Sequence, residues 1–170
     1  MNLADYVRAV PGFPQPGVLF RDITPLLLNA EAFRYVLDAL VEIAERADAE
    51  SIVGIESRGF IFGTPIADRM GLPFVPVRKP GKLPAARMSV EYSLEYGESQ
   101  LDIHEDAVAR GQRCFIVDDL LATGGTARAA AKLVELIGGK VVGLGFVIEL
   151  DGLQGRRQLE GYAVHSLLHY

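Results

Sequence analysis

Cysteine and long apolar runs are scarce in this sequence of 170 residues. The single cysteine, Cys114, excludes an internal disulfide and a zinc site built from cysteines, and it favours a reducing compartment. The longest apolar run, 141–148, ends at Glu149 and falls well short of the ~20 residues that span a membrane. We therefore expect a cytoplasmic, soluble protein with no membrane partner.

A basic excess is also missing, because 17 lysines and arginines face 22 aspartates and glutamates, for a net charge of −5. Proteins that bind nucleic acid usually carry a basic surface. We therefore expect no nucleic-acid partner. The exception is local: residues 70–90 contain four basic side chains and no acid, which makes a positive patch on an acidic protein.

Apolar runs of strand length alternate with amphipathic segments along the chain, and no repeat or linker divides it. This alternation is typical of parallel βαβ units with helices on both faces of a sheet. Residues 78–103 fit no helix and suggest a hairpin or a long flap, which in a compact domain is usually functional. We predict helices over 31–47, 60–70 and 124–137, and strands over 51–55, 73–77, 113–117, 140–148 and 162–168. The two prolines of 73–77 suggest an edge strand or an irregular one.

The segment FIVDDLLATGGTA (115–127) carries the strongest functional pattern. An apolar strand leads through two acids and a glycine-rich turn into a helix, and ligands of open α/β sheets bind at the carboxyl ends of strands. Amide groups at a helix start suit a phosphate, while Gly124 and Gly125 allow close backbone approach. A nucleoside-triphosphatase loop and a dinucleotide fingerprint are both excluded, because neither GxxxxGK[ST] nor GxGxxG is present.

The acids Asp118 and Asp119 would repel a phosphate unless they face another part of the ligand. Ribose hydroxyls are the obvious partners for paired carboxylates. The alternative is a capped helix with both aspartates on a solvated turn.

VDDLLATGGT (117–126) resembles the phosphoribosyl pyrophosphate motif of the type I phosphoribosyltransferases. Further segments resemble the adenine-specific members of that family in order and spacing, over nearly the whole chain. They are FPQPGVLFRDITPLL (13–27), GIESRGFIFG (54–63), RKPGKLP (78–84) and EYSLEYG (91–97).

The resemblance implies a single α/β domain over 1–170, with an open, mainly parallel sheet flanked by helices. A small hood (about 1–30) and a flexible flap (about 78–103) would cover the carboxyl ends of the strands. The implied reaction joins adenine to phosphoribosyl pyrophosphate, giving AMP and pyrophosphate. Mg²⁺ would be bound through pyrophosphate and water rather than by the protein directly, and the chain would form a homodimer.

Two rival functions stay open at this point. One is phosphoribosyl transfer to another base, such as xanthine. The other is a non-catalytic regulator that senses phosphoribosyl pyrophosphate and controls nucleic acid. Such a regulator should carry a basic surface, whereas this chain is acidic.

The resemblance also assigns residues that hold the sugar and its phosphates. Asp118 and Asp119 would bind the ribose hydroxyls and stabilise positive charge at the anomeric carbon. Arg58 would bind a phosphate or the base, the alternative being an ion pair with Glu56. The 5′-phosphate would be held by Ala122, Thr123, Gly124, Gly125 and Thr126, and pyrophosphate by Arg78, Lys79 and Lys82, some of them reaching the neighbouring subunit's site.

Adenine would be read by the main chain of Leu19, Phe20 and Arg21, with Leu120 packed on a ring face. The alternative for Leu19 and Phe20 is that they are core residues. Glu95, on the flap, would be the general acid/base at N7 of the base, the alternative being an exposed hairpin acid.

Other suggestive residues carry no function in this interpretation. His104 and Glu105 begin like a zinc-protease helix, but Val108 stands where a second histidine is required. We expect structural or surface roles for His165 and His169, and a buried apolar role for Cys114.

Overall fold

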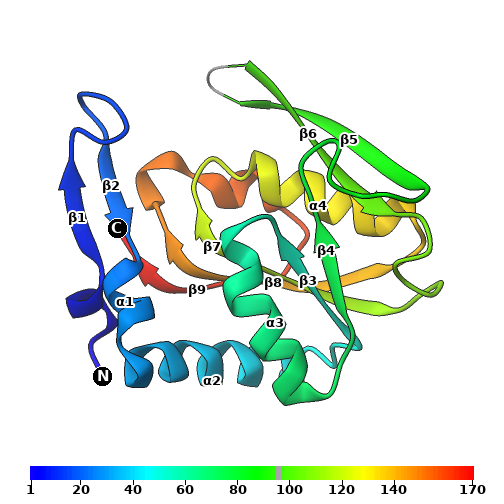
Figure 1. Cartoon of the computed structure of the whole chain (residues 1–170), viewed down its shortest axis with the longest axis horizontal. Coiled ribbons are helices and arrows are strands. Elements are labelled where there is room, and N and C mark those ends of the chain that lie inside the picture. The colour runs from blue at the N-terminus through cyan, green and yellow to red at the C-terminus, as the bar shows by residue number, and fades with distance from the viewer. Residues whose placement is uncertain (95–96) are drawn as a thin grey trace. The chain divides into compact units, whose positions relative to one another are not determined.

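The computed structural model describes residues 1–94 and 97–170 (Figure 1). The chain divides into two compact units, Met1–Ala39 and Leu40–Tyr170. None of the helices in the described ranges is long and apolar enough to cross a membrane.

The first unit is built around a small antiparallel hairpin. After a short 3₁₀ turn, η1 (Leu3–Tyr6), strand β1 (Arg8–Pro11) pairs with β2 (Leu19–Asp22), so that Val10 lies opposite Phe20. A short helix, α1 (Thr24–Leu28), leads to α2 (Ala30–Arg46), which continues into the second unit. The Asn29 side chain begins α2 by accepting a hydrogen bond from the Ala32 amide at 2.9 Å, as expected of an N-terminal cap.

A five-stranded parallel sheet forms the centre of the second unit, which confirms the predicted fold class. Its strand order is β4-β3-β7-β8-β9, so β4 lies at an edge, as its prolines predict. The strands are β3 (Ser51–Ile55), β4 (Phe74–Val77), β7 (Arg113–Leu121), β8 (Lys140–Glu149) and β9 (Val164–His169).

Helices cover both faces of this sheet. Residues of one face of β7, including Cys114 and Ile116, pack with the buried alanines of α4 (Gly125–Leu136). On the other face, helix α3 (Arg58–Met70) and the end of α2 cover the sheet: a Cβ on Gly145 would meet Phe115 and Leu40. Successive side chains of a strand point to opposite faces of the sheet. Because helices cover both faces, every residue of β3 is buried.

Strand β7 is longer than predicted, and this corrects the interpretation of the two acids. Asp118 pairs with Phe146 and Leu120 pairs with Ile148 on β8, so the ladder continues to Leu121. Asp118 and Asp119 therefore lie within the last residues of the strand rather than after it. Pairing with β8 outweighs the low strand propensity of aspartate, as tertiary context often does.

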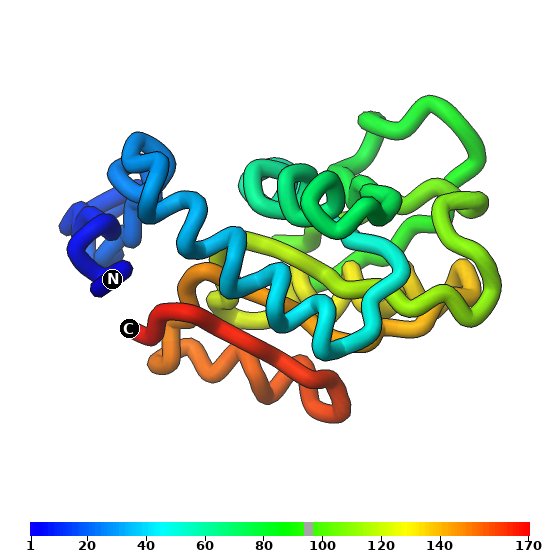
Figure 2. Tube along the Cα trace, turned by 90° about the horizontal axis from the view of Figure 1, so that it is seen from below, coloured from blue at the N-terminus to red at the C-terminus, as the bar shows by residue number. Residues whose placement is uncertain are grey.

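The predicted flap contains a second antiparallel hairpin, β5 (Arg87–Leu94) with β6 (Gly97–His104). In Figure 1 this green hairpin projects from the sheet beside α4. The segment between β8 and β9 consists of two 3₁₀ turns, η2 (Asp151–Leu153) and η3 (Gly155–Leu159). Figure 2 shows this orange segment running alongside β9 in red.

Candidate active site

A pocket of about 350 Å³ lies at the carboxyl ends of β3 and β7. This is where a parallel sheet places its ligands. The lining combines the end of each strand, the glycine-rich turn, one residue of the basic loop and the base of the hairpin. Its residues are Glu56, Ser57, Arg58, Lys79, Tyr92, Ser99, Leu101, Asp118, Asp119, Leu120, Leu121, Ala122, Thr123, Gly124, Thr126 and Ala127.

The pocket brings together most of the residues predicted for the sugar and its phosphates. Sequence reasoning missed Glu56 as a site residue, as well as Ser57, Tyr92, Ser99 and Leu101. A signal for Glu56 existed, because it directly follows a buried parallel strand, as a site residue of such a sheet often does.

Gly124 shapes the turn before α4, which we call the phosphate loop (residues 122–126). It is the N-cap residue, with φ +88, a conformation that favours glycine. A Cβ at this position would lie 2.3 Å from the carbonyl oxygen of Gly155. The sequence suggested that this glycine makes room for a ligand, but it also makes room for the chain behind the loop.

The start of α4 is open to an anion. Gly124 has no side chain to cap the helix, and no acid occupies the first turn. Unbonded amide groups and the helix dipole together favour a phosphate at such a terminus. The alternative interpretation, a capped helix with exposed aspartates, is wrong, since Asp119 is only 6% exposed.

The second glycine of the phosphate loop faces the hairpin. A Cβ on Gly125 would lie 3.4 Å from the Ser93 carbonyl oxygen and from the Tyr92 ring. The Thr126 hydroxyl also forms a 3.2 Å hydrogen bond with the Tyr92 hydroxyl. The hairpin is therefore packed directly against the first turn of α4.

The two aspartates at the end of β7 differ in their surroundings. Arg58 Nε donates to Asp119 Oδ2 at 2.6 Å, so the predicted alternative of an Arg58–Glu56 pair is wrong. Asp118 Oδ1 accepts the Asp119 amide at 2.9 Å. Desolvation and the neighbouring Asp119 charge hold the pKa of Asp118 well above its ordinary value, although Arg58 opposes them.

Close backbone packing fixes the start of α3 against these acids. A Cβ on Gly59 would lie 2.7 Å from the Val117 carbonyl oxygen and 3.2 Å from Asp118 Oδ1. Only a glycine lets the helix that carries Arg58 approach β7 so closely. Gly59 did not stand out in the sequence, because its partner is nearly sixty residues away.

Glu56 organises the basic loop after β4. It accepts hydrogen bonds from Arg78 Nε at 3.1 Å and from the Lys79 amide at 3.0 Å. Burial raises the pKa of Glu56, but these two hydrogen bonds and the nearby Arg78 and Lys82 charges outweigh it, so the pKa is lowered. The carboxylate is therefore charged and holds the loop at the edge of the pocket.

The three basic residues predicted to bind pyrophosphate take different positions. Lys79 lines the pocket, whereas Arg78 and Lys82 are not among the described residues that do so. The Arg78 guanidinium lies 5.9 Å from the centre of the Phe60 ring and donates to the Lys82 carbonyl at 3.4 Å. Arg78 thus supports the loop that presents Lys79.

The residues predicted to hold adenine belong to different units. Leu120 lines the pocket in the second unit. In the first unit, Phe20 packs edge-on against Phe13 at 5.1 Å between ring centres, and Leu19 is 49% exposed. The alternative that Leu19 is a core residue is therefore wrong. Arg21 lies on the same strand.

Glu95, the predicted proton-transfer group, lies outside the described residues.

A second hollow, of about 530 Å³, lies between the hairpin and α4, and its lining includes the exposed Arg128 and Lys132. It is larger than the pocket at the strand ends. The carboxyl pair and Arg58 line only the smaller one, so chemistry rather than volume marks the candidate site.

The donor set of the pocket bears on the predicted Mg²⁺. Magnesium is usually bound by one or two carboxylates together with substrate phosphates and water. Of the pocket carboxylates, Glu56 and Asp119 are already paired with arginines. These residues fit an ion that arrives with pyrophosphate better than a resident ion in a protein cage.

The phosphoribosyl transferase domain family matches residues 31–168 of the chain. An adenine phosphoribosyltransferase of Gloeobacter violaceus is 58% identical over the whole length of both chains. The structure of one from Thermoanaerobacter pseudethanolicus superposes with a TM-score of 0.95 at 52% identity, over 99% of this chain and 98% of that one.

A further similar structure, from Saccharomyces cerevisiae, has a TM-score of 0.93 at 41% identity over 97% of this chain and 96% of that one. It holds adenine and an imino-altritol bisphosphate. The pocket geometry and these full-length similarities agree: the chain belongs to the phosphoribosyltransferase family and, within it, to the adenine phosphoribosyltransferases.

Proposed function

We propose that this chain transfers the phosphoribosyl group of phosphoribosyl pyrophosphate to adenine, giving AMP and pyrophosphate. The observation that carries the proposal is a single pocket that joins an uncapped helix start to a carboxyl pair at the end of a parallel strand. An anion site and a hydroxyl-binding site side by side match a sugar phosphate. The family to which the chain belongs supplies the reaction.

The sugar phosphate would bind at the end of β7. Amides and hydroxyls of residues 122–126 would hold the 5′-phosphate, and Asp118 and Asp119 would bind the ribose hydroxyls. As the bond to pyrophosphate breaks, positive charge grows at the anomeric carbon, and nearby carboxylates stabilise it. Arg58 fixes Asp119 in place, and the Asp119 amide holds one carboxylate oxygen of Asp118.

Pyrophosphate leaves from the side of the basic loop. Lys79 and Arg58 line the pocket there and would balance its charge. A bound Mg²⁺ would neutralise further charge on the leaving group. We further propose a homodimer in which Arg78 and Lys82 reach toward the neighbouring subunit's site, which accords with their position outside the lining of this one.

Adenine would attack through N9, on the face opposite the departing pyrophosphate, with inversion at the anomeric carbon. The N7 proton would pass to Glu95 as the new bond forms. Leu19, Phe20, Arg21 and Leu120 would hold the base, and the adenine bound to the yeast relative supports adenine as that base. We propose that 1–170 acts as one cytoplasmic domain, with about 1–30 as its hood and about 78–103 as its flap.

Pyrophosphate release tests this function when adenine, hypoxanthine, guanine and xanthine are supplied in turn with phosphoribosyl pyrophosphate and Mg²⁺. We expect release with adenine far above the other three. Release with xanthine alone would contradict the choice of base. Release with none of the four would contradict the enzyme and favour the rival ligand sensor.

A further inference from the structure

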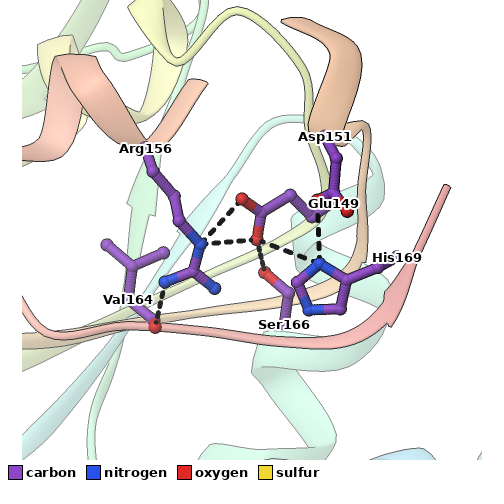
Figure 3. A network of polar contacts seen from close by, with 6 residues as sticks. All are labelled: Glu149, Asp151, Arg156, Val164, Ser166 and His169. Carbon is purple, nitrogen blue, oxygen red and sulfur yellow. Dashed lines mark hydrogen bonds and ion pairs between the residues drawn. The ribbon is translucent and has the colours of Figure 1, made fainter. Parts of the chain in front are cut away.

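An ion pair between a buried glutamate and a partly exposed arginine lies behind the phosphate loop, and no step of the proposed reaction uses it. Glu149, at the end of β8, is 4% exposed. Arg156 Nε donates to both of its carboxylate oxygens, at 2.7 and 2.9 Å, and the Ser166 hydroxyl donates to Oε2 at 2.6 Å (Figure 3). The single Nε hydrogen is shared between the two oxygens, and charge-assisted hydrogen bonds of this kind are strong.

The carboxylate could suggest a cation site, because Glu149, Asp151 and His169 offer ligand atoms within 4.8 Å of one another. Arg156 already neutralises Glu149, however, and His169 Nδ1 is 2.9 Å from Asp151 Oδ1. The view in Figure 3 shows the guanidinium and the imidazole on either side of the same carboxylate. This group is therefore a closed polar network, and its function is to hold chain segments together.

The segment 150–156 is held at both ends. At its start, the Leu150 amide donates to the Leu121 carbonyl at 2.9 Å, and the Asp151 amide donates to Tyr170 at 2.9 Å. Further along, Arg156 is bonded to Glu149 and donates to the Val164 carbonyl at 2.8 Å. The residue next to Arg156 is Gly155, so its backbone position depends directly on the ion pair.

Gly155 is the residue on which the phosphate loop lies. A Cβ on Gly155 would come within 2.2 Å of the Ala122 carbonyl oxygen, and a Cβ on Gly124 within 2.3 Å of the Gly155 carbonyl oxygen. The two backbones thus pack against each other with no side chain between them. Arg128 adds a longer contact, from Nη1 to the Gln158 carbonyl at 3.4 Å.

We propose that Glu149 and Arg156 are positioning residues for 5′-phosphate binding. By fixing Gly155, they hold residues 122–124 in the shape that aims the amides of the loop at the phosphate. The proposal rests on the proposed function for the identity of the ligand, but the positioning itself is a property of the free protein. A small misplacement of binding groups by a remote change can cost up to about 100-fold in rate. An ion pair outside the pocket can therefore have a measurable effect on the loop.

Two variants of the network and one control test the proposal. Arg156→Gln keeps a polar side chain but loses the charge, and Arg156→Lys keeps the charge but loses the planar fork. The control is Arg157→Gln, since Arg157 is the exposed neighbour on the same 3₁₀ turn. AMP and adenosine are titrated calorimetrically, because the two ligands differ only in the phosphate.

We expect the dissociation constant of AMP to rise about 10- to 100-fold in Arg156→Gln, to rise less in Arg156→Lys, and to stay unchanged in Arg157→Gln. The affinity for adenosine should be the same in all three. Equal weakening of AMP and adenosine, or an AMP affinity within twofold of the wild type in a folded variant, would overturn the proposal. If Arg156→Gln does not fold, Arg156→Lys decides by the same criteria.

Hydrogen exchange on the unliganded proteins separates this proposal from the function itself. The Arg128 amide reports on the loop, because it donates to the Gly124 carbonyl at 2.9 Å; it should exchange about tenfold faster in Arg156→Gln than in the wild type, while amides of β5 keep their rates. Unchanged exchange in the loop would refute the positioning role even if the enzyme is active. Faster exchange in a protein that makes no AMP would support the positioning role and contradict the function.

Discussion

The phosphate loop and the β5–β6 hairpin line the same pocket, but they are held in different ways. The loop is fixed by main chain against main chain, at Gly124 and Gly155, with no freedom for a side chain between them. The hairpin forms a two-stranded sheet of its own, which a backbone bridge between Asp102 and Arg78 joins to the basic loop. Its base is fixed by polar side chains around the fully buried Asp102.

Asp102 ties the hairpin to the basic loop. Its Oδ1 accepts the Ser89 hydroxyl and the Gln100 amide, both at 2.7 Å, and Arg87 lies 3.3 Å from Oδ2. The backbone of Asp102 also pairs with that of Arg78, at 2.7 and 3.0 Å. The base of the hairpin is thus fixed to the basic loop through both side chains and main chain.

Under the proposed function, this difference means that phosphate binding and proton transfer belong to parts of the molecule that are held in different ways. A cradle made of backbone amides must keep its shape before the ligand arrives. A group that serves only the chemical step can be carried on a segment that closes over the substrate. Changes in the loop should therefore affect binding, and changes in the hairpin should affect the chemical step.

The largest expected effect is on the chemical step, in Glu95→Gln. General acid–base catalysis contributes about 10²–10⁴-fold, so the single-turnover rate of AMP formation should fall by at least about 100-fold. The AMP dissociation constant and the free energy of unfolding should not change. Glu98→Gln, at the start of β6, is the matched control. A wild-type rate in Glu95→Gln would remove this residue from proton transfer.

Gly124→Ala should disturb the backbone packing that holds the phosphate loop. The added Cβ would meet the Gly155 carbonyl at 2.3 Å on a backbone with φ +88, and overpacking costs about 1–3 kcal/mol. We expect a loss of that size in the free energy of unfolding, measured in urea, and AMP affinity reduced by about tenfold or more. Gly152→Ala is the control, because nothing lies within 4 Å of its added Cβ. Equal behaviour of the two variants would argue against a backbone-built cradle.

Asp102→Ala should loosen the hairpin while the loop keeps its shape. Ser89 and Gln100 lose their shared acceptor, and each lost hydrogen bond costs about 0.5–1.5 kcal/mol in unfolding free energy. The turnover rate should fall more than the AMP affinity. Asp106→Ala, at an exposed turn after β6, should do neither. If AMP affinity falls as much as turnover, the hairpin also shapes the binding site.

Asp118→Asn should separate stability from binding. The pKa of Asp118 is raised in the folded protein by desolvation and by Asp119, so the folded state favours the protonated acid. The resulting stability is present at low pH and is lost as pH rises from 3.8, the ordinary value, to the raised value. At neutral pH the variant should therefore melt above the wild type, by a few degrees at most, as followed by circular dichroism.

The same variant should bind AMP about 10-fold more weakly, since a charged acceptor for a hydroxyl is worth about 1.5–3 kcal/mol. A lower melting temperature with unchanged AMP affinity would contradict both the expected cost of Asp118 to stability and its role in binding the ribose.

Tyr92→Phe should give the smallest effect, because it removes only the 3.2 Å hydrogen bond between the hairpin and Thr126. Such a bond contributes about 0.5–1.5 kcal/mol. We expect an unfolding free energy lower by that amount and a turnover reduced less than tenfold. A loss as large as that of Glu95→Gln would mean that the Tyr92 hydroxyl itself acts in the reaction.

The sequence predicts the fold well because its signals are local. Apolar runs such as 51–55 and 140–148 reveal strands, and Gly71, with φ +64, ends α3 where expected. The phosphate loop is recognisable for the same reason: its acids, glycines and threonines are adjacent. The end of β7 cannot be recognised in this way, because its last residues form a strand only by pairing with β8.

The pairings inside the site depend on contacts between distant residues, which one sequence does not encode. Arg58 has an acid two residues away, yet it bonds Asp119, sixty-one residues away. Gly155 supports the phosphate loop although nothing near it in the sequence resembles a motif. Adenine recognition is hard to predict for another reason, since backbone groups of any residue type can read the edge of a base.

A crystal structure of the chain with AMP bound tests the central claim most directly. We predict that the phosphate lies within hydrogen-bond distance of amides of residues 123–126, and that the ribose hydroxyls contact Asp118 and Asp119. A phosphate held instead in the hollow beside Arg128 and Lys132, with the two aspartates free of the sugar, would contradict the account.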